Sequence, residues 1–103
     1  MTGRPTIVRP PGFEVDIHGA FVRRTDLSHA NLERANLSYA DATNANLRGA
    51  NFKDANLQGT ILRGADLREA KNLTREQLSA AIIDETTLLP DYLKREELLS
   101  AQR

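Results

Sequence analysis

The sequence of 103 residues contains no cysteine and no tryptophan. Without thiols the chain can form no disulfide, no thiolate metal site and no cysteine nucleophile. Fourteen Lys and Arg residues balance fourteen Asp and Glu residues, so no net charge draws the chain to nucleic acid or to an anionic membrane. No apolar run approaches the roughly 18 residues that a transmembrane helix needs. We therefore expect no membrane and no nucleic-acid partner.

The beginning of the sequence also lacks the pattern of a secretory signal. Met1–Pro11 is rich in proline and contains no apolar stretch of the length that a signal peptide requires. We therefore expect a cytoplasmic location.

A five-residue repeat runs from Val15 to Glu69, in eleven consecutive blocks. The first position is small and mostly alanine, the second is mostly Asp or Asn, and the third is apolar and mostly leucine. The fourth and fifth positions are polar and vary freely. The third-position residues are Ile17, Val22, Leu27, Leu32, Leu37, Ala42, Leu47, Phe52, Leu57, Leu62 and Leu67.

A period of five fits neither regular element. In an α-helix five residues advance by about 140° beyond a full turn, so successive leucines would be distributed around the whole helix surface. In a strand, successive leucines would fall on opposite faces. The chain must therefore bend once in each block. If each bend is about 90°, four blocks close a square coil of about 20 residues, and stacked coils lie about 4.8 Å apart.

The A(D/N)LXX repeat of residues 15–69 resembles the pentapeptide-repeat family. The resemblance implies an all-β solenoid, a right-handed quadrilateral β-helix of about three coils with a C-terminal α-helical cap. We predict an N-terminal arm and cap over residues 1–14, with Phe13 and Val15 covering the first coil. The repeat helix spans 15–70, and a C-terminal helical cap and tail spans 71–103.

A 20-residue coil predicts which side chains stack inside it. One column holds Ile17, Leu37 and Leu57; the others hold Val22, Ala42 and Leu62; Leu27, Leu47 and Leu67; and Leu32 and Phe52. Phe52 is oversized and Ala42 is undersized, so we expect the phenyl ring to fill the volume left at Ala42. We expect the second-position Asp and Asn side chains to bond to nearby backbone rather than to calcium.

The register of the repeat breaks after Ala70, where helix signals begin. Thr74 and Gln77 form a T-x-x-Q capping box. It predicts a helix over residues 75–83, which covers the last coil with Leu78, Ala81 and Ile82. Pro90 opens a second, weaker helix through Ala101. This second helix either packs against the cap, frays in solution or joins two subunits in a homodimer. Its apolar residues are Tyr92, Leu93, Leu98 and Leu99.

Residues that could carry chemistry are few and scattered. His18 and His29 occupy fourth and fifth positions, so both are expected to face solvent. The carboxylates lie on a convex surface with no cleft to shift their pKa values. We therefore predict a protein that is not an enzyme and has no cofactor and no metal site.

One departure from the repeat suggests an interaction surface. Phe21 and Ile61 replace the usual second-position Asp or Asn on the same side of the coil, and Tyr39 lies at the adjoining corner. Arg23 and Arg63 flank these apolar residues. Exposed apolar patches rimmed by charge often mark contacts. Either an unidentified protein partner binds this edge, or the termini of the chain itself cover it.

A group of arginines offers a second surface, which includes Arg23, Arg48, Arg63 and Arg68. Acidic residues lie among them and no aromatic residue interleaves to stack bases, which favours a mixed solvated surface over an anion-binding scaffold. The leading hypothesis is a structural or protein–protein interaction module. Some pentapeptide-repeat relatives are acidic rods that resemble DNA and bind a type II topoisomerase (gyrase). The neutral charge and short length of this chain argue against that alternative.

Overall fold

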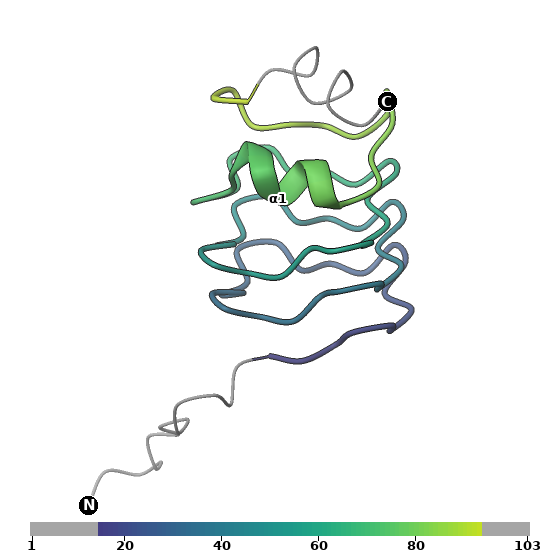
Figure 1. Ribbon diagram of the computed structural model, residues 1–103. Helices are drawn as coiled ribbons and strands as arrows, with labels where there is room; N and C mark the ends of the chain where they lie inside the picture. Colours follow the sequence, from purple (N-terminus) through teal and green to yellow (C-terminus); the bar gives the residue numbers. More distant parts are fainter. Residues whose placement is uncertain (1–14, 94–103) are drawn as a thin grey trace, which may run out of the picture.

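The computed structural model describes residues 15–93, which wind as a stack of square coils (Figure 1). Parallel backbone bridges pair each second-position residue with the one 20 positions later: Asp16 with Asn36, and Asn36 in turn with Asn56. The bridges on the other three sides have the same spacing through Asn51 and Lys71. The predicted solenoid with its 20-residue coil is confirmed.

Three backbone hydrogen bonds join successive coils on each side. A third-position N–H donates to the second-position carbonyl of the next coil, as from Ile17 to Asn36 at 2.9 Å. The N–H of Asn36 donates back to the carbonyl of Val15 at 2.8 Å, and the fifth-position N–H of Gly19 donates to the carbonyl of Ser38 at 2.9 Å. The coils therefore satisfy one another's backbone groups, as β-strands do in a sheet.

The first and third positions fill the interior. From Leu32 to Leu67 every third-position side chain is at most 4 % exposed, whereas those of the first coil (Ile17, Val22 and Leu27) are only partly buried. The predicted columns therefore have the correct register. Phe52 and Ala42 are both buried in this core, and the filling of the space at Ala42 by the phenyl ring stays a prediction.

The corners of the coil depend on the fifth position, which sequence reasoning treated as unrestricted. All eleven fifth-position residues have a positive φ between 57° and 73°, and only four of them are glycine. The third-position carbonyl accepts the N–H of the next first-position residue, as from Ala20 to Ile17 at 3.0 Å. This bond, with a positive φ at the third residue of the turn, defines a type II β-turn.

Three fifth-position glycines also make room for a side chain of the preceding coil. A Cβ atom on Gly49 would lie 2.4 Å from the His29 ring, and one on Gly59 would lie 2.4 Å from the Tyr39 ring. Asn44 lies in the same way against Gly64.

The repeat gives way after Ala70 to a fourth, irregular turn of the chain. Lys71 still pairs with Asn51, and helix α1, Arg75–Ala80, occupies the next side (Figure 1). Ile82 then pairs with Ile61, and Leu88 with Asp66, at spacings of 21 and 22 residues. The backbone therefore returns to pairing on the two remaining sides.

The predicted capping box is present, but the predicted end of the helix is wrong. Thr74 Oγ1 accepts the N–H of Gln77, and Gln77 Oε1 accepts the N–H of Thr74. The helix ends at Ala80 rather than at 83, because the N–H of Ile82 donates to the carbonyl of Thr60 at 2.8 Å in extended pairing. Ile82 consequently lies on the surface, 37 % exposed, and Ile83 is buried in its place.

Two further predictions reach beyond the described residues. Of the predicted second helix, Pro90 to Leu93 forms a turn, in which the N–H of Leu93 donates to the carbonyl of Pro90; residues 94–101 lie outside the described part of the chain. The predicted N-terminal cap, Phe13 included, also lies outside it.

The corner geometry predicts opposite effects for two glycine exchanges. Arg24→Gly removes a non-glycine residue with φ of 57° and should stabilise the fold by roughly 1 kcal/mol. Gly49→Ala places a Cβ against His29 at a φ of 73° and should destabilise it by more than about 1 kcal/mol. Urea denaturation measures the free energy of unfolding of both variants. Changes of the same sign would contradict the assignment of the fifth position to the corner.

Candidate functional site

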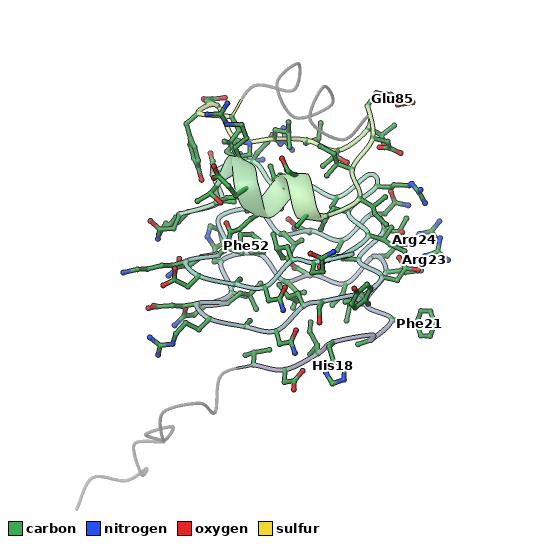
Figure 2. The ribbon with its side chains drawn as sticks, in the orientation of Figure 1. His18, Phe21, Arg23, Arg24, Phe52 and Glu85 are labelled. Atoms are coloured by element: carbon green, nitrogen blue, oxygen red, sulfur yellow. The ribbon has the colours of Figure 1, made fainter. Side chains whose placement is uncertain are left out.

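The described residues contain no cluster of metal-binding side chains. Within residues 15–93 no three His, Cys, Asp or Glu side chains gather as a metal site would require. No helix in the same range is long and apolar enough to cross a membrane. His18 and His29 are exposed, as predicted, and His18 Nδ1 lies 2.6 Å from Asp16 Oδ1 (Figure 2).

The second-position Asp and Asn side chains shape the turns. Asp26 Oδ1 accepts the N–H of Ser28 at 3.0 Å and its hydroxyl at 2.7 Å. Asn36 accepts the same two bonds from Ser38. All nine second-position Asp and Asn residues accept the N–H two residues on, which confirms that they bond to nearby backbone; the nine are Asp16, Asp26, Asn31, Asn36, Asp41, Asn46, Asn51, Asn56 and Asp66.

These bonds lower carboxyl pKa values on an open surface, which corrects the expectation that only a cleft could shift them. Hydrogen bonds from the side chain and then the backbone of Ser28 lower the pKa of Asp26, and those of Thr43 do the same for Asp41. The side chain of Arg68 is the largest cause of the lowered pKa of Asp66. Held ionised, these groups are poorly suited to act as general acids.

One column of second-position residues differs from the other three. It consists of Phe21, Asp41, Ile61 and Ile82, each bridged to the next, and we call it, with Tyr39 at its edge, the Phe21 face. Phe21 is 84 % exposed, Tyr39 is 66 % exposed and Ile61 is partly buried. Phe21 and Ile61 therefore share one side as predicted. No side chain within residues 15–93 shields the Phe21 ring.

Two members of the Phe21 face were missed from sequence. Asp41 lies between Phe21 and Ile61, which the 20-residue period could have revealed. Ile82 was assigned to a helix, because the irregular fourth turn shifts its pairing with Ile61 by one residue.

Arginines surround the carboxylate of the Phe21 face. Arg23 Nε lies 3.7 Å from Asp41 Oδ2, and the charges of Arg23 and Arg63 both contribute to the lowered pKa of Asp41. Arg23 and Arg24 project from the same side of the stack as Phe21 (Figure 2). The face thus combines exposed apolar groups with a positively charged rim.

The wider arginine group is largely neutralised by its neighbours. Arg48 donates to both carboxylate oxygens of Glu69, at 3.2 and 3.3 Å. Arg68 donates to both oxygens of Asp66, at 2.9 and 2.8 Å. These pairings favour the mixed-surface interpretation over the anion scaffold.

The residues predicted as a dimer contact divide into two groups. The Tyr92 hydroxyl donates to the carbonyl of Ala70 and accepts the N–H of Leu73, and Leu93 packs against the core. Leu98 and Leu99 lie outside the described residues. The homodimer contact itself stays a prediction.

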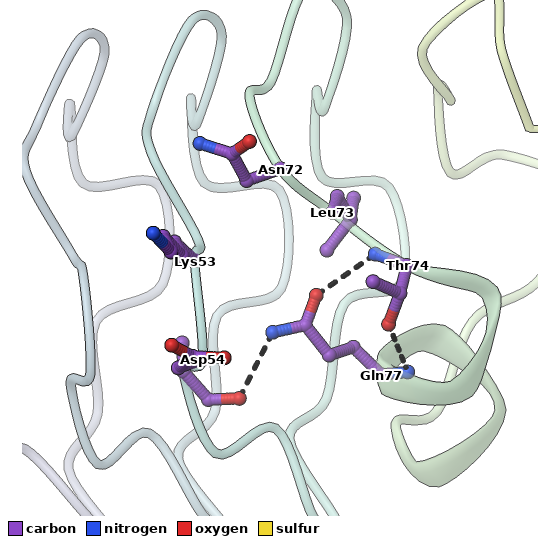
Figure 3. A pocket seen from close by; sticks show the side chains of 7 residues that line it. Lys53, Asp54, Asn72, Leu73, Thr74 and Gln77 are labelled. Atoms are coloured by element: carbon purple, nitrogen blue, oxygen red, sulfur yellow. Dashed lines mark hydrogen bonds between the residues drawn. The ribbon is translucent and has the colours of Figure 1, made fainter.

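Two open hollows of about 500 Å³ lie near the C-terminal end. The first surrounds Gln77 and Thr74, whose side chains are hydrogen-bonded to the chain itself (Figure 3). The second is lined by Arg48, Arg68 and Tyr92, which are likewise hydrogen-bonded within the chain. These side chains are therefore already engaged in bonds within the chain.

Comparisons with known proteins agree with the fold. The family model for pentapeptide repeats matches eight copies over residues 13–49 and 50–71, and the chain belongs to this family. No curated protein sequence gives a significant match.

Solved structures give the same answer. The pentapeptide-repeat protein Rfr23 from the cyanobacterium Cyanothece 51142 is similar, with a TM-score of 0.65 and 31 % identity over 74 % of this chain and 51 % of Rfr23. HetL from Nostoc sp. strain PCC 7120, described as involved in heterocyst differentiation regulation, is also similar. Its TM-score is 0.62, with 33 % identity over 74 % of this chain and 35 % of HetL. The chain spans about half the length of Rfr23 and about a third of HetL.

The lowered carboxyl pKa values predict a loss of stability in acid. The pKa values of Asp26 and Asp41 are lower in the folded chain than the ordinary value of 3.8, so the unfolded chain binds more protons near that pH. The stabilisation is present above pH 4 and is lost as the pH falls through 3.8 towards the folded values. The Tm should therefore fall between pH 5 and pH 2.

The double variant Asp26→Asn, Asp41→Asn tests the cause. Asparagine keeps the acceptor oxygen, as the Asn36–Ser38 pair shows, but does not titrate. We expect a shallower fall of Tm in acid, and an unchanged slope would contradict the assignment. Asp26→Ala, which loses both bonds, should lower the Tm at every pH.

Proposed function

We propose that the chain is a non-catalytic protein–protein interaction module that contacts its partner through the Phe21 face. The observation that carries this proposal is the Phe21 ring, which is 84 % exposed at a position where the other sides of its coil carry Asp or Asn. An aromatic ring at a second position forgoes the bond to the turn, so it contributes little there to the fold. Aromatic residues and arginine are enriched at protein interfaces.

The chemistry of the face indicates the kind of partner. Phe21, Tyr39 and Ile82 supply apolar surface, and Arg23 and Arg63 supply positive charge beside it. A complementary partner would present an apolar patch bordered by carboxylates. HetL is described as taking part in a regulatory process, which is compatible with binding rather than turnover. The cytoplasmic location stays a prediction.

We also propose that the segment from Lys71 is the C-terminal cap of a right-handed helix of about three coils. On three sides its backbone reaches first-position carbonyls of the coil beneath, as Lys71 does for Ala50 at 2.8 Å. On the side of α1, the Gln77 side chain replaces the backbone. Its Nε2 donates to the carbonyl of Ala55 at 3.0 Å (Figure 3) and to that of Phe52 at 2.8 Å.

The cap is tested at Gln77. Gln77→Ala should cost roughly 1–3 kcal/mol in the free energy of unfolding, because it leaves the Ala55 carbonyl without its donor. Gln77→Glu keeps an acceptor for Thr74 but sets a carboxylate against two carbonyl oxygens, so it should cost at least as much. Urea denaturation measures both variants, and a wild-type midpoint for either would contradict the role.

The interaction surface is tested by the double variant Phe21→Ala, Ile61→Ala. Its Tm should stay close to wild type, since Phe21 is exposed and Ile61 is partly exposed. Proteins co-purified from the native cell with the wild-type chain should lose about tenfold or more of their enrichment. The matched control is Lys53→Ala, Gln58→Ala, two exposed residues. The proposal would be contradicted if the control variant lost as much enrichment as the double variant, or if the double variant lost no enrichment.

A further inference from the structure

The first coil, residues 15–34, has one edge without a neighbouring coil within residues 15–93. In the coils above, the second-position N–H donates to the coil beneath, as from Asn36 to Val15 at 2.8 Å. The carbonyl of the same residue accepts from that coil, as from Ile17 at 2.9 Å. The corresponding N–H and C=O groups of the first coil point away from the stack; they belong to Asp16, Phe21, Asp26 and Asn31. We call them the first-coil edge.

The interior is also open at this end. Ile17 and Leu27 are only partly buried, whereas their counterparts one coil up, Leu37 and Leu47, are 4 % and 2 % exposed. Within residues 15–93, the backbone groups of the first-coil edge and the apolar side chains beside it are therefore uncovered, and solenoids and sheets ordinarily cover such ends.

We propose that a second copy of this chain covers the first-coil edge, related by a two-fold axis perpendicular to the stack. A residue that directs both its N–H and its C=O to one side is the hydrogen-bonded site of an antiparallel ladder, in which opposed residues exchange both bonds. The first-coil edge presents one such residue on each of its four sides. An inverted copy presents the same four, so two bonds form on every side in an isologous dimer.

The residues that precede Val15 are poorly suited to continue the repeat beneath this edge. In the 20-residue register Pro10 would lie under Ala30, whose N–H makes the turn bond to Leu27 at 3.1 Å. Proline has no N–H to make that bond. Gly12 would lie under Leu32 and has no side chain to fill the interior. A second copy supplies both the donors and the apolar residues.

The charges at the end of the stack restrict how two copies can pair. The near four-fold symmetry of the end allows four orientations. In one of them Asp16 lies opposite Asp26, and in another each aspartate lies opposite the same residue of the second copy. Repulsion between like charges disfavours both. Of the other two, only the pairing of Asp16 with Asn31 and of Phe21 with Asp26 leaves equal gaps on all four sides, because the coil rises by one strand spacing in each turn. The dimer uses this orientation.

The test compares two variants of one residue in the full chain. Asn31→Ala and Asn31→Pro both lose the side-chain bond to Glu33, but only proline removes an N–H of the first-coil edge. That N–H has no partner within residues 15–93, so proline should leave the fold of the single chain intact. Sedimentation equilibrium should give a dimer for wild type and for Asn31→Ala. Asn31→Pro should weaken it roughly tenfold or more, since each N–H is lost twice.

Cross-linking identifies the orientation, because the chain has no cysteine. Opposed residues of an antiparallel hydrogen-bonded pair have Cα atoms about 5.5 Å apart, within reach of a disulfide. Asn31→Cys mixed with Asp16→Cys should give an oxidised heterodimer, and Asn31→Cys mixed with Asp26→Cys should give none. The matched control is Gln58→Cys, at an exposed position in the third coil. It should give no oxidised heterodimer. None of these variants alters Phe21 or Ile61, so the result is independent of the proposed partner surface.

Three outcomes would overturn the proposal. One is a monomer at every concentration, and slow amide exchange at Asp16 and Asp26 in that monomer would assign the edge to residues before Val15. Another is a dimer that Asn31→Pro and Asn31→Ala weaken equally. The third is a dimer that survives Asn31→Pro and disappears when residues 94–103 are removed, which would place the contact at the C-terminal end.

Discussion

The type II corner at every fifth residue is the constraint on which the rest of the structure depends. The third-position carbonyl accepts the N–H three residues on, as in the Ile17–Ala20 turn, and the residue between them takes a positive φ. The second-position oxygen braces the same turn from outside, as Asp26 does for Ser28. Four such corners bring the chain back above its starting point. Only then can the backbone of one coil pair with the next and the leucines stack.

This constraint also separates the residues that hold the fold from those that can vary. The first and third positions are committed to the interior and most second positions to the turn, so specific contacts are left to the outward positions. Carboxylates bound into turns stay ionised, and arginines such as Arg48 and Arg68 are paired with them. A rigid stack with such a surface is suited to present side chains to a partner. The Phe21 face departs from the rule, and that departure supports a role in binding.

Much of the fold was predictable because each block repeats the same local physics. The period of five required a corner, the 20-residue coil placed columns such as Ile17, Leu37 and Leu57 correctly, and Thr74 with Gln77 marked the start of α1. The positive φ at the fifth position was missed because several of these positions carry arginine, histidine or tyrosine, which rarely adopt it. Gly49 and Gly59 are the residue type that normally indicates such a φ. The end of α1 was missed because its cause, pairing of Ile82 with Ile61, lies 21 residues away.

The candidate site shows the same division. The repeat, its inward residues and the exceptional Phe21 and Ile61 could be read from the sequence, because they follow from side-chain type at a regular spacing. The folded chain was needed to show that Asp41 and Ile82 complete their column and that the Gln77 side chain stands in for a backbone donor. It was also needed to show that the outward N–H and C=O groups of the first coil have no partner within residues 15–93. Each of these depends on which coil lies above or below, and the inserted residues after Ala70 shift that relation where the period no longer applies.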